Sequence, residues 1–266
     1  MDDHDFRQLL NRFHLSWEGY RKVRKGMKKR LHRHMQQTGY PHFRQYLQAI
    51  DENPEVKHQC QLLLTVSISR FFRDRRLWEV LETDIVPGVL AANLEEVRAW
   101  SAGCALGQEV YTFKILWQEI ERATGRGPYL RLWATDMNPD YLRRAQAGVY
   151  PRSSLKEVPA VFLNTYFKSL RGKTSFSIDD ALKEDVIWET WDLLSPPPAT
   201  GFQFVFLRNN LLTYYKAELK VPAFATIAES ITKGGYLMIG SHERIPSAFE
   251  GYFTCRHRSG ILQKTA

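Results

Sequence analysis

Cysteine is scarce in this sequence of 266 residues, and long apolar runs are missing from it. The three cysteines, Cys60, Cys104 and Cys255, lie far apart and form no C-x-x-C pair, which argues against a disulfide framework and against a zinc site. We therefore expect free thiols and no bound metal. No apolar run approaches the roughly 18 residues that a membrane span needs, and the first residues, MDDHDFRQLL, are acidic where a signal peptide is basic. These absences favour a soluble, cytoplasmic protein that does not insert into membranes.

What is present is an excess of positive charge: 37 Lys and Arg residues against 29 Asp and Glu residues give a formal net charge of +8. A basic balance of this size suggests an acidic partner, namely nucleic acid, an anionic membrane surface or an acidic protein. The hydrophobic content of 44% and the charged content of 25% are ordinary for a globular chain with a buried core.

Residues 2–66 have helical periodicity, with breaks at 38–41 and 51–54, and predict a small helical domain. Within it, the stretch WEGYRKVRKGMKKRLHRHM (17–35) predicts one helix with an apolar stripe and an opposite basic arc. The stripe consists of Tyr20, Val23, Met27, Leu31 and Met35, and the arc of Arg21, Lys22, Lys25, Lys28, Lys29 and Arg33. Like charges at this spacing repel, so the arc is a candidate substrate-binding surface; a solvated basic face is an equal alternative. We expect no nucleic acid, because the interleaved aromatics of a single-strand binder are missing from the arc.

The period changes after a helical connector. VRAWSAG, EVYTFKILWQEIERAT, PYLRLWATDMN and PDYLRRAQAGVY predict strand, helix, strand and helix in turn, which indicates parallel βαβ units and an α/β fold. FQFVFLRNN predicts a buried strand, and AELKVPAFATIAESIT a helix that runs on until Gly234-Gly235 stops it. GGYLMIGSH predicts the next strand, and YFTCRHRSGILQKT an edge hairpin. KTSFSIDDALKEDVIWETWDLL predicts an insertion of short strands joined by an acidic turn.

A strand-to-helix turn in RAWSAGCALGQEVYTF (98–113) falls where a doubly wound sheet binds ligands. Gly103 and Gly107 let a ligand approach the backbone there, and packing alone is the alternative use of such glycines. The dinucleotide fingerprint G-x-G-x-x-G is absent, and Glu109 puts a carboxylate where phosphate would bind. The turn therefore favours a non-phosphorylated nucleoside with a cationic part.

Two further strands end in polar residues at the same edge of the predicted sheet. Asp136, at the end of the second strand, is placed to accept hydrogen bonds from both ribose hydroxyls. Its alternative role is to cap the next helix, which Asn138 could do equally well. Asn209 and Asn210 follow Arg208 at the end of a buried strand, where an ordinary strand-end turn is the alternative.

Five blocks in order, VSISRFFRD, RAWSAGCALGQEVYTF, LWATDMNPDYLRRAQAGVY, FQFVFLRNNLLTYY and GGYLMIGSHERI, resemble the signature blocks of the CheR-type methyltransferases. Members of this family esterify glutamate side chains of bacterial chemoreceptors with S-adenosyl-L-methionine and release S-adenosyl-L-homocysteine. The resemblance implies an N-terminal all-helical domain at 1–66, a linker and connector helix at 67–94, and a Rossmann-like methyltransferase domain at 95–266 with a small inserted β-subdomain at about 168–191.

The same resemblance implies the roles of individual residues. Arg73 matches a position at the cofactor or the methyl-transfer site, and Asp192 and Leu193 resemble the pair that flanks the adenine ring. The cofactor-binding set expected in this way is Ser67, Ser69, Arg73, Ala102, Gly103, Glu109, Asp136, Met137, Asp192, Leu193, Asn209 and Asn210. For catalysis we expect Arg73, which would orient the acceptor carboxylate, and Tyr214; a salt bridge within the linker is the alternative role of Arg73.

Some positions depart from the family pattern. Ser67-Ile68-Ser69 replaces Asn-x-Thr, and Thr213 replaces a tyrosine for which Tyr214 or Tyr215 could compensate. SLRGKTSFSID lacks the glycine-rich loop of members that dock on a receptor tail pentapeptide, so we expect methylation without such tethering. We expect the partner to be an acidic helical region of a chemoreceptor or a related signalling protein, and the chain to act as a monomer. A different acceptor, or a non-catalytic protein that binds S-adenosylmethionine or S-adenosylhomocysteine, stays open as an alternative.

Overall fold

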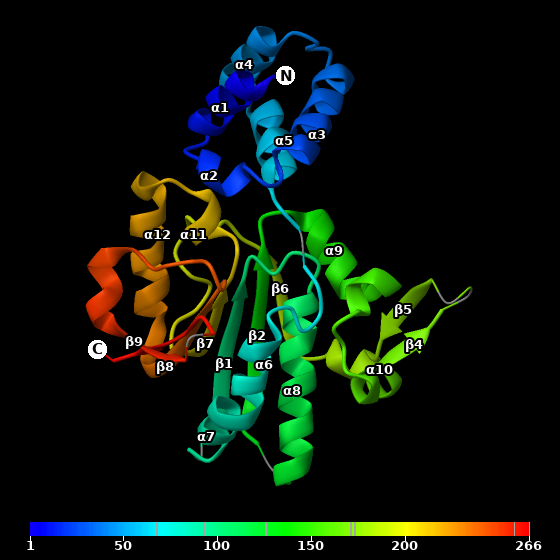
Figure 1. Ribbon diagram of the computed structural model, residues 1–266, viewed down its shortest axis with the longest axis vertical. Helices are drawn as coiled ribbons and strands as arrows, with labels where there is room; N and C mark the ends of the chain where they lie inside the picture. The colour runs from blue at the N-terminus through cyan, green and yellow to red at the C-terminus, as the bar shows by residue number, and fades with distance from the viewer. Residues whose placement is uncertain are drawn as a thin grey trace. The chain divides into compact units, whose positions relative to one another are not determined.

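The computed structural model describes residues 1–67, 69–92, 94–125, 127–170, 172, 174–257 and 259–265, apart from the side chain of His257. The chain forms two compact units (Figure 1). Unit 1 consists of Met1–Val66 together with Asn209–Pro222, and unit 2 consists of Ser67–Arg208 together with Ala223–Ala266. Each unit therefore contains two separate stretches of the sequence. No helix in the described part of the chain is long and apolar enough to cross a membrane.

Unit 1 is a bundle of short helices around a hydrophobic core. Capping residues stabilise the N-termini of two of these helices. Asp2 forms a capping box with Asp5 at the first helix, and Asn53 caps the helix that begins at Pro54. The apolar stripe predicted for this region is buried at Tyr20, Met27, Leu31 and Met35. The helices are α1 (Asp3–Arg12), α2 (Trp17–Tyr20), α3 (Arg24–Gln37), α4 (Phe43–Glu52), α5 (Pro54–Leu64) and α11 (Leu211–Tyr214), and α12 (Ala217–Ser230) begins here.

The prediction of one helix over residues 17–35 was wrong, because residues 21–23 form a turn between α2 and α3. Packing within unit 1 explains the break. A Cβ atom at Gly19 would lie 2.3 Å from the carbonyl oxygen of Thr213, and Ser16 donates its backbone N–H to the carbonyl of Tyr214 over 2.7 Å. The segment Asn209–Pro222 thus fixes α2 in a direction that α3 does not continue.

Unit 2 is built on a seven-stranded sheet with the order β6-β2-β1-β7-β8-β10-β9. The first five strands in this order run parallel, and β10 and β9 add an antiparallel hairpin at one edge, as the sequence predicts. The strands are β1 (Glu96–Ala102), β2 (Tyr129–Asp136), β6 (Val186–Thr190), β7 (Phe202–Leu207), β8 (Ile231–Ile239), β9 (Phe253–His257) and β10 (Ile261–Lys264).

Two helices pack on the same face of this sheet through aromatic contacts. Trp78 of α6 stacks on Phe206 of β7 at 5.7 Å, and Phe113 of α8 lies 5.0 Å from Phe206 and 5.2 Å from Phe204. Since strand residues two apart point to one face, α6 and α8 share that face. The helices of unit 2 are α6 (Arg75–Val80), α7 (Val86–Leu90), α8 (Gln108–Thr124), α9 (Pro139–Ala147) and α10 (Ala160–Tyr166), and a π-helical turn (Leu81–Ile85) joins α6 to α7.

A second, three-stranded sheet has the order β3-β5-β4, with β3 (Val149–Pro151), β4 (Phe167–Ser169) and β5 (Ser175–Ile178). Its strands span 149–178, whereas the sequence predicted a subdomain at about 168–191. The difference arises at β6, which leaves the small sheet and pairs with β2 from Leu132 to Asp136. Trp188 of β6 contacts Tyr111 of α8 at 5.9 Å, so burial against α8 fixes this strand in the main sheet.

The sequence predicted that Gly234-Gly235 stops the preceding helix, and this prediction was wrong. The helix α12 ends at Ser230, and the glycines lie within β8, beside a register shift between Phe202 and Phe204 of β7. A Cβ atom at Gly235 would lie 2.9 Å from the carbonyl oxygen of Phe202. The pair therefore permits a close approach of two strands at an irregularity.

The strand order places a topological switch point between β1 and β7. The chain passes from β1 to β2 and then β6 on one side of the sheet, and returns to β7 on the other side of β1. In such sheets ligands bind outside the carboxyl ends of the strands at this point. Ala102 and Leu207 end these two strands, so the candidate site lies around the residues that follow them.

Candidate functional site

The turn after β1 is tied to the end of β2 by backbone hydrogen bonds. Gly103 and Cys104 both donate their N–H groups to the carbonyl of Thr135, over 2.9 and 2.8 Å. Ala105 has a φ of 50°, unusual for a residue with a side chain, and donates its N–H to Asp136 Oδ2 over 2.9 Å. The turn is therefore held in one conformation by the same strand end that carries Asp136.

The two glycines of this turn have different surroundings. Gly107, with a φ of 80°, directly precedes α8, and a Cβ atom there would lie 2.9 Å from the Cβ of Ala145 and 3.2 Å from the ring of Trp188. Packing therefore accounts for Gly107, which was one of the two uses open from the sequence. Gly103 has a φ of 79° and lies in the turn itself, at the carboxyl end of β1.

Asp136 is a buried acid, with 8% of its surface exposed. Its Oδ1 accepts the N–H of Asn138 over 2.9 Å, and its Oδ2 accepts the N–H of Ala105. Burial raises the pKa of this carboxyl, and the two backbone hydrogen bonds oppose that rise. Asn138 is the residue that caps α9, so the capping role proposed as an alternative for Asp136 is already filled.

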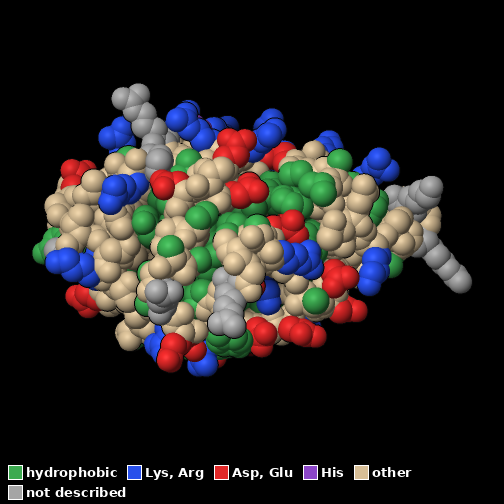
Figure 2. Space-filling model, turned by 90° about the horizontal axis from the view of Figure 1, so that it is seen from below, with side chains coloured by type: hydrophobic (Ala, Val, Ile, Leu, Met, Phe, Trp, Pro, Cys, Tyr) green, Lys and Arg blue, Asp and Glu red, His purple; other side chains and the backbone are tan. Residues whose placement is uncertain are grey.

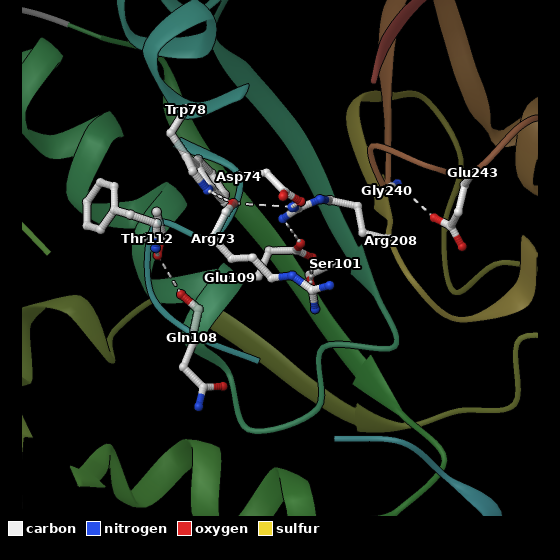
Figure 3. A network of polar contacts seen from close by, with 11 residues as sticks. Arg73, Asp74, Trp78, Ser101, Gln108, Glu109, Thr112, Arg208, Gly240 and Glu243 are labelled. Atoms are coloured by element: carbon white, nitrogen blue, oxygen red, sulfur yellow. Dashed lines mark hydrogen bonds and ion pairs between the residues drawn. The ribbon is translucent and has the colours of Figure 1, made fainter. Parts of the chain in front are cut away.

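Glu109, in the first turn of α8, belongs to a buried ion-pair network (Figure 3). Its Oε1 accepts the hydroxyl of Ser101 over 2.8 Å, and its Oε2 accepts Nη1 of Arg208 over 2.9 Å. Arg208 donates from Nη2 to Asp74 Oδ2 over 2.6 Å and to the carbonyl of Arg73 over 3.3 Å. The Arg208 side chain is 4% exposed, and its guanidinium lies 5.8 Å from the ring centroid of Trp78.

Charged side chains of both signs gather in this part of unit 2. Asp74 and Glu109 pair with the buried guanidinium of Arg208, and Arg73 extends into the same region in Figure 3. Two buried atoms here, Arg208 Nε and Gln108 Oε1, have no hydrogen-bond partner among the described residues. Asp136 has no ion-pair partner among the described residues, so its buried carboxylate, together with the open oxygen of Gln108, suits a polar ligand that donates hydrogen bonds or carries positive charge.

The end of β6 lies beside the end of β2. Asp136 pairs with Thr190, and Trp191 donates its N–H to the carbonyl of Asp136 over 3.0 Å. Met137, Asp192 and Leu193 follow these strand ends, and all three are partly exposed. Asp192 Oδ1 accepts the N–H of Leu194 over 3.0 Å, which fixes the turn. The structure thus brings together the residues predicted to border the sugar and the adenine ring.

The other predicted site residues lie elsewhere along the chain. Ser67 and Ser69 are partly buried in the linker, on either side of Ile68, which lies outside the described residues. Asn209, with a φ of 56°, and Asn210, which caps α11, fall in unit 1. The ring of Tyr214 lies 4.9 Å from that of Tyr20 within unit 1, in a packing position.

Four residues of the network were missing from the predicted set, namely Asp74, Trp78, Ser101 and Arg208. Arg208 stood in the sequence beside the two predicted asparagines at the strand end, and Asp74 next to Arg73. Their positions were visible signals, but only the structure shows that the two side chains meet.

The chain resembles known proteins over most of its length. The family model described as "CheR methyltransferase, SAM binding domain" matches residues 67–260. A chemotaxis protein methyltransferase of Listeria monocytogenes is 31% identical over 219 residues, which are 82% of this chain and 81% of that protein. Chemotaxis protein methyltransferase 1 of Pseudomonas aeruginosa is 28% identical over 242 residues, 88% of this chain and 87% of that protein. A 104.1 kDa protein of Rhodobacter capsulatus is 28% identical over 236 residues, and the chain spans 24% of it.

Among solved structures, the N-methyltransferase NodS of Bradyrhizobium japonicum in complex with S-adenosyl-L-homocysteine is 12% identical, with a TM-score of 0.40 over 79% of this chain and 97% of that chain.

Proposed function

The chain belongs to the CheR methyltransferase family, and from that premise we propose that it forms methyl esters on glutamate side chains of a chemoreceptor-type signalling protein. It is an S-adenosylmethionine-dependent methyltransferase with a Rossmann-like fold. One observation of the structure carries the proposal: Asp136, a buried carboxylate without an ion-pair partner among the described residues, lies at the end of β2 and bonds the turn at the switch point of the sheet.

The residues at this point fit the cofactor. Asp136 keeps lone pairs for the ribose hydroxyls after accepting its two backbone N–H groups. In the proposal, Met137, Asp192 and Leu193 border the adenine ring, and the remaining cofactor contacts come from Ala102, Gly103, Ser67 and Ser69. In the proposal, Glu109 and Asp136 supply the negative charge that a sulfonium and an ammonium group require. Asn209 and Asn210 stay in the proposed set.

When bound, S-adenosyl-L-methionine supplies an electrophilic methyl group, whose transfer to a carboxylate oxygen forms a C–O bond, breaks the C–S bond and leaves a neutral ester and a thioether. A glutamate with a pKa of about 4.3 is already ionised near neutral pH, so the protein needs no general base. It must instead position the carboxylate and exclude water. We assign the orientation of the acceptor carboxylate to Arg73 and keep Tyr214 as a proposed catalytic residue.

The exposed cations of unit 1 form the proposed surface for the acceptor. Lys22, Lys25, Lys29 and Arg33 are exposed and have no ion-pair partner within the described ranges. Lys28 is bonded to Asp3 over 2.7 Å and Arg21 to Glu18 over 3.1 Å, so these two contribute less free charge. On the face drawn in Figure 2, by contrast, basic and acidic side chains are interspersed. Charge of one sign on a helix steers an acidic helical partner.

We further propose that methylation is independent of a pentapeptide tether, and that the chain acts in the cytoplasm as a monomer. The independence from a tether is supported by the segment SLRGKTSFSID, which contains no glycine-rich loop. Arg171 and Lys173 of this segment lie outside the described residues. The three-stranded sheet that contains β4 and β5 is the place where a tether would be tested.

Incubation with a purified chemoreceptor cytoplasmic fragment and methyl-labelled S-adenosylmethionine tests the function. We expect label in the fragment that alkali releases as methanol, which is the property of a methyl ester. A receptor fragment without its tail pentapeptide is expected to be labelled equally well. Alkali-stable label would indicate a different acceptor group, and micromolar cofactor binding without any transfer would indicate a non-catalytic binding protein.

A further inference from the structure

The turn that carries Arg73 has an unusual backbone. Phe72 and Asp74, on either side of Arg73, have φ values of 53° and 63°. This left-handed conformation is unfavourable for residues with a Cβ atom, and such strain persists only where surrounding contacts hold it. Here it occurs twice within three residues, and the residue between them is the one that the proposed function uses to orient the acceptor.

Hydrogen bonds to Phe72, Arg73 and Asp74 hold this turn. Phe72 donates its N–H to the hydroxyl of Thr112 over 3.2 Å. The carbonyl of Arg73 accepts Trp78 Nε1 over 2.8 Å and Arg208 Nη2 over 3.3 Å. The carboxylate of Asp74 accepts the same Nη2 over 2.6 Å. Arg208 therefore binds the turn at two successive residues.

The side chain of Asp74 does not make the helix-capping hydrogen bond that its position in the chain would allow. It directly precedes α6, where an aspartate commonly caps a helix with its side chain. In the left-handed conformation its side chain makes no capping hydrogen bond and reaches Arg208 instead. The pairing with Arg208 has thus displaced the local interaction that would stabilise the helix.

Arg208 brings a positive charge into this buried position. A guanidinium stays protonated throughout the accessible pH range, and a side chain that is 4% exposed must have its charge compensated. Glu109 alone would supply one compensating carboxylate. Asp74 supplies a second carboxylate and connects the guanidinium to the strained turn.

We propose that Asp74 and Arg208 are positioning residues for methyl transfer: their ion pair fixes the turn from Phe71 to Asp74 and through it the place of the Arg73 side chain. This inference rests on the proposed function, because it gives Arg73 the task of orienting the acceptor carboxylate. When the turn is loosened, the protein still binds the cofactor but binds the acceptor carboxylate poorly. The effect of the pair therefore falls on the acceptor and not on S-adenosylmethionine.

Asp74→Asn tests this without changing the size of the side chain, and asparagine tolerates the left-handed backbone. The matched control is Asp185→Asn, because Asp185 has a φ of 58°, is exposed, and accepts the hydroxyl of Tyr129 with its carboxylate. We expect Asp74→Asn to raise the KM for a purified receptor fragment about tenfold, as a misplaced positioning group does. Arg208→Lys keeps the charge without the fork and is expected to raise it likewise, and Asp74→Glu to restore part of the loss.

Two binding measurements separate positioning from stability. Calorimetry is expected to give Asp74→Asn the wild-type Kd for S-adenosylmethionine, and a weakened Kd for the receptor fragment when S-adenosylhomocysteine is present, so that no turnover takes place. The inference is overturned if Asp74→Asn and Asp185→Asn have the same KM and the same Kd for the receptor fragment. It is also overturned if the affinity for the cofactor and the thermal midpoint of Asp74→Asn fall as much as its affinity for the acceptor. Arg73→Ala is measured beside them. If it leaves acceptor affinity unchanged, the role of Arg73 in the proposed function fails; if it weakens acceptor binding while Asp74→Asn does not, the positioning inference alone fails.

Discussion

Among single residues, Asp136 is the one that we expect to make cofactor binding sensitive to pH. Burial raises the pKa of its carboxyl, with two backbone N–H groups acting against that rise. A protonated carboxyl accepts fewer hydrogen bonds, so we expect the affinity for S-adenosylmethionine to fall as the solution becomes acidic. The fall begins at a pH above the ordinary aspartate value of about 3.9. Calorimetric titration from neutral to mildly acidic pH measures it.

Asp136→Asn provides the control for this prediction. The amide has one acceptor oxygen in place of two, so cofactor affinity at neutral pH is expected to drop by roughly tenfold to a hundredfold, the size of one hydrogen bond to a charged group, and the remaining affinity to vary little with pH. The same raised pKa has a consequence for folding, because the folded state binds the proton more tightly. The stability contributed by Asp136 is present below about pH 3.9 and is lost as the pH rises through the folded value. An unchanged pH dependence in the variant would assign the titration to another group.

The polar ends of the strands could be predicted from the sequence, and their pairing could not. Glu109 and Asp136 follow from their positions after a predicted strand. Arg208 needed the register of β7 on β1, in which Ser101 lies opposite Phe206. Continuing that register places Arg208 level with Gly103, at the switch point. Register is set by contacts between strands that are about a hundred residues apart, so the short-range pattern of the sequence carries no record of it.

Among the elements, α3 carries the prediction on partner recognition. Reversing the charges of Lys25 and Lys29 to glutamate is expected to lower kcat/KM for an acidic receptor fragment about tenfold at low salt, and less at high salt, because steering is screened. Steady-state rates at two ionic strengths measure this. Cofactor affinity is expected to stay unchanged.

The matched control reverses Arg44 and Lys57, two exposed cations of α4 and α5 that also belong to unit 1. It produces the same change in net charge away from α3. Equal losses in the two double variants would reduce the effect to net charge, and no loss in the α3 variant would remove the steering proposal.

Element boundaries show where local patterns were overridden. The apolar stripe on either side of residues 21–23 follows one helical period, yet the helix breaks there because Gly19 packs on the backbone of Thr213. The strand at 186–190 was predicted as a strand but not its sheet, since both sheets accept a short apolar strand. Local periodicity predicts that an element exists, whereas its partner is decided by packing.

For the molecule as a whole, the α/β class followed from the alternation of strands and helices, and the structure confirms it. The sequence did not predict that unit 1 includes Asn209–Pro222, because this segment follows β7 and lies far along the chain from residues 1–66. Besides Ser16 and Tyr214, this segment is bound through Lys216, which donates its N–H to the carbonyl of His14 over 2.9 Å. Contacts of such long range leave no periodic signal in the chain.

Two glycine substitutions test whether this segment closes unit 1. Gly19→Ala is expected to lower the free energy of unfolding by about 1–3 kcal/mol, because its Cβ would overlap the Thr213 carbonyl. Gly26→Ala in α3 meets nothing within 4 Å and is expected to raise stability by about 0.5–1 kcal/mol. Hydrogen exchange of α1, α2 and α11 is expected to accelerate in the first variant alone. If Gly19→Ala left these rates unchanged, residues 209–222 would not be needed for the unit.

The division of unit 1 between two distant stretches has a consequence for biosynthesis. A ribosome releases residues 1–66 first, and these must wait for 209–222 before their packing is complete. By then β1, β2, β6 and β7 have already left the exit tunnel. The unit proposed to meet the partner is consequently among the last to mature, and a nascent polypeptide truncated anywhere before Pro222 lacks the finished form of this proposed surface.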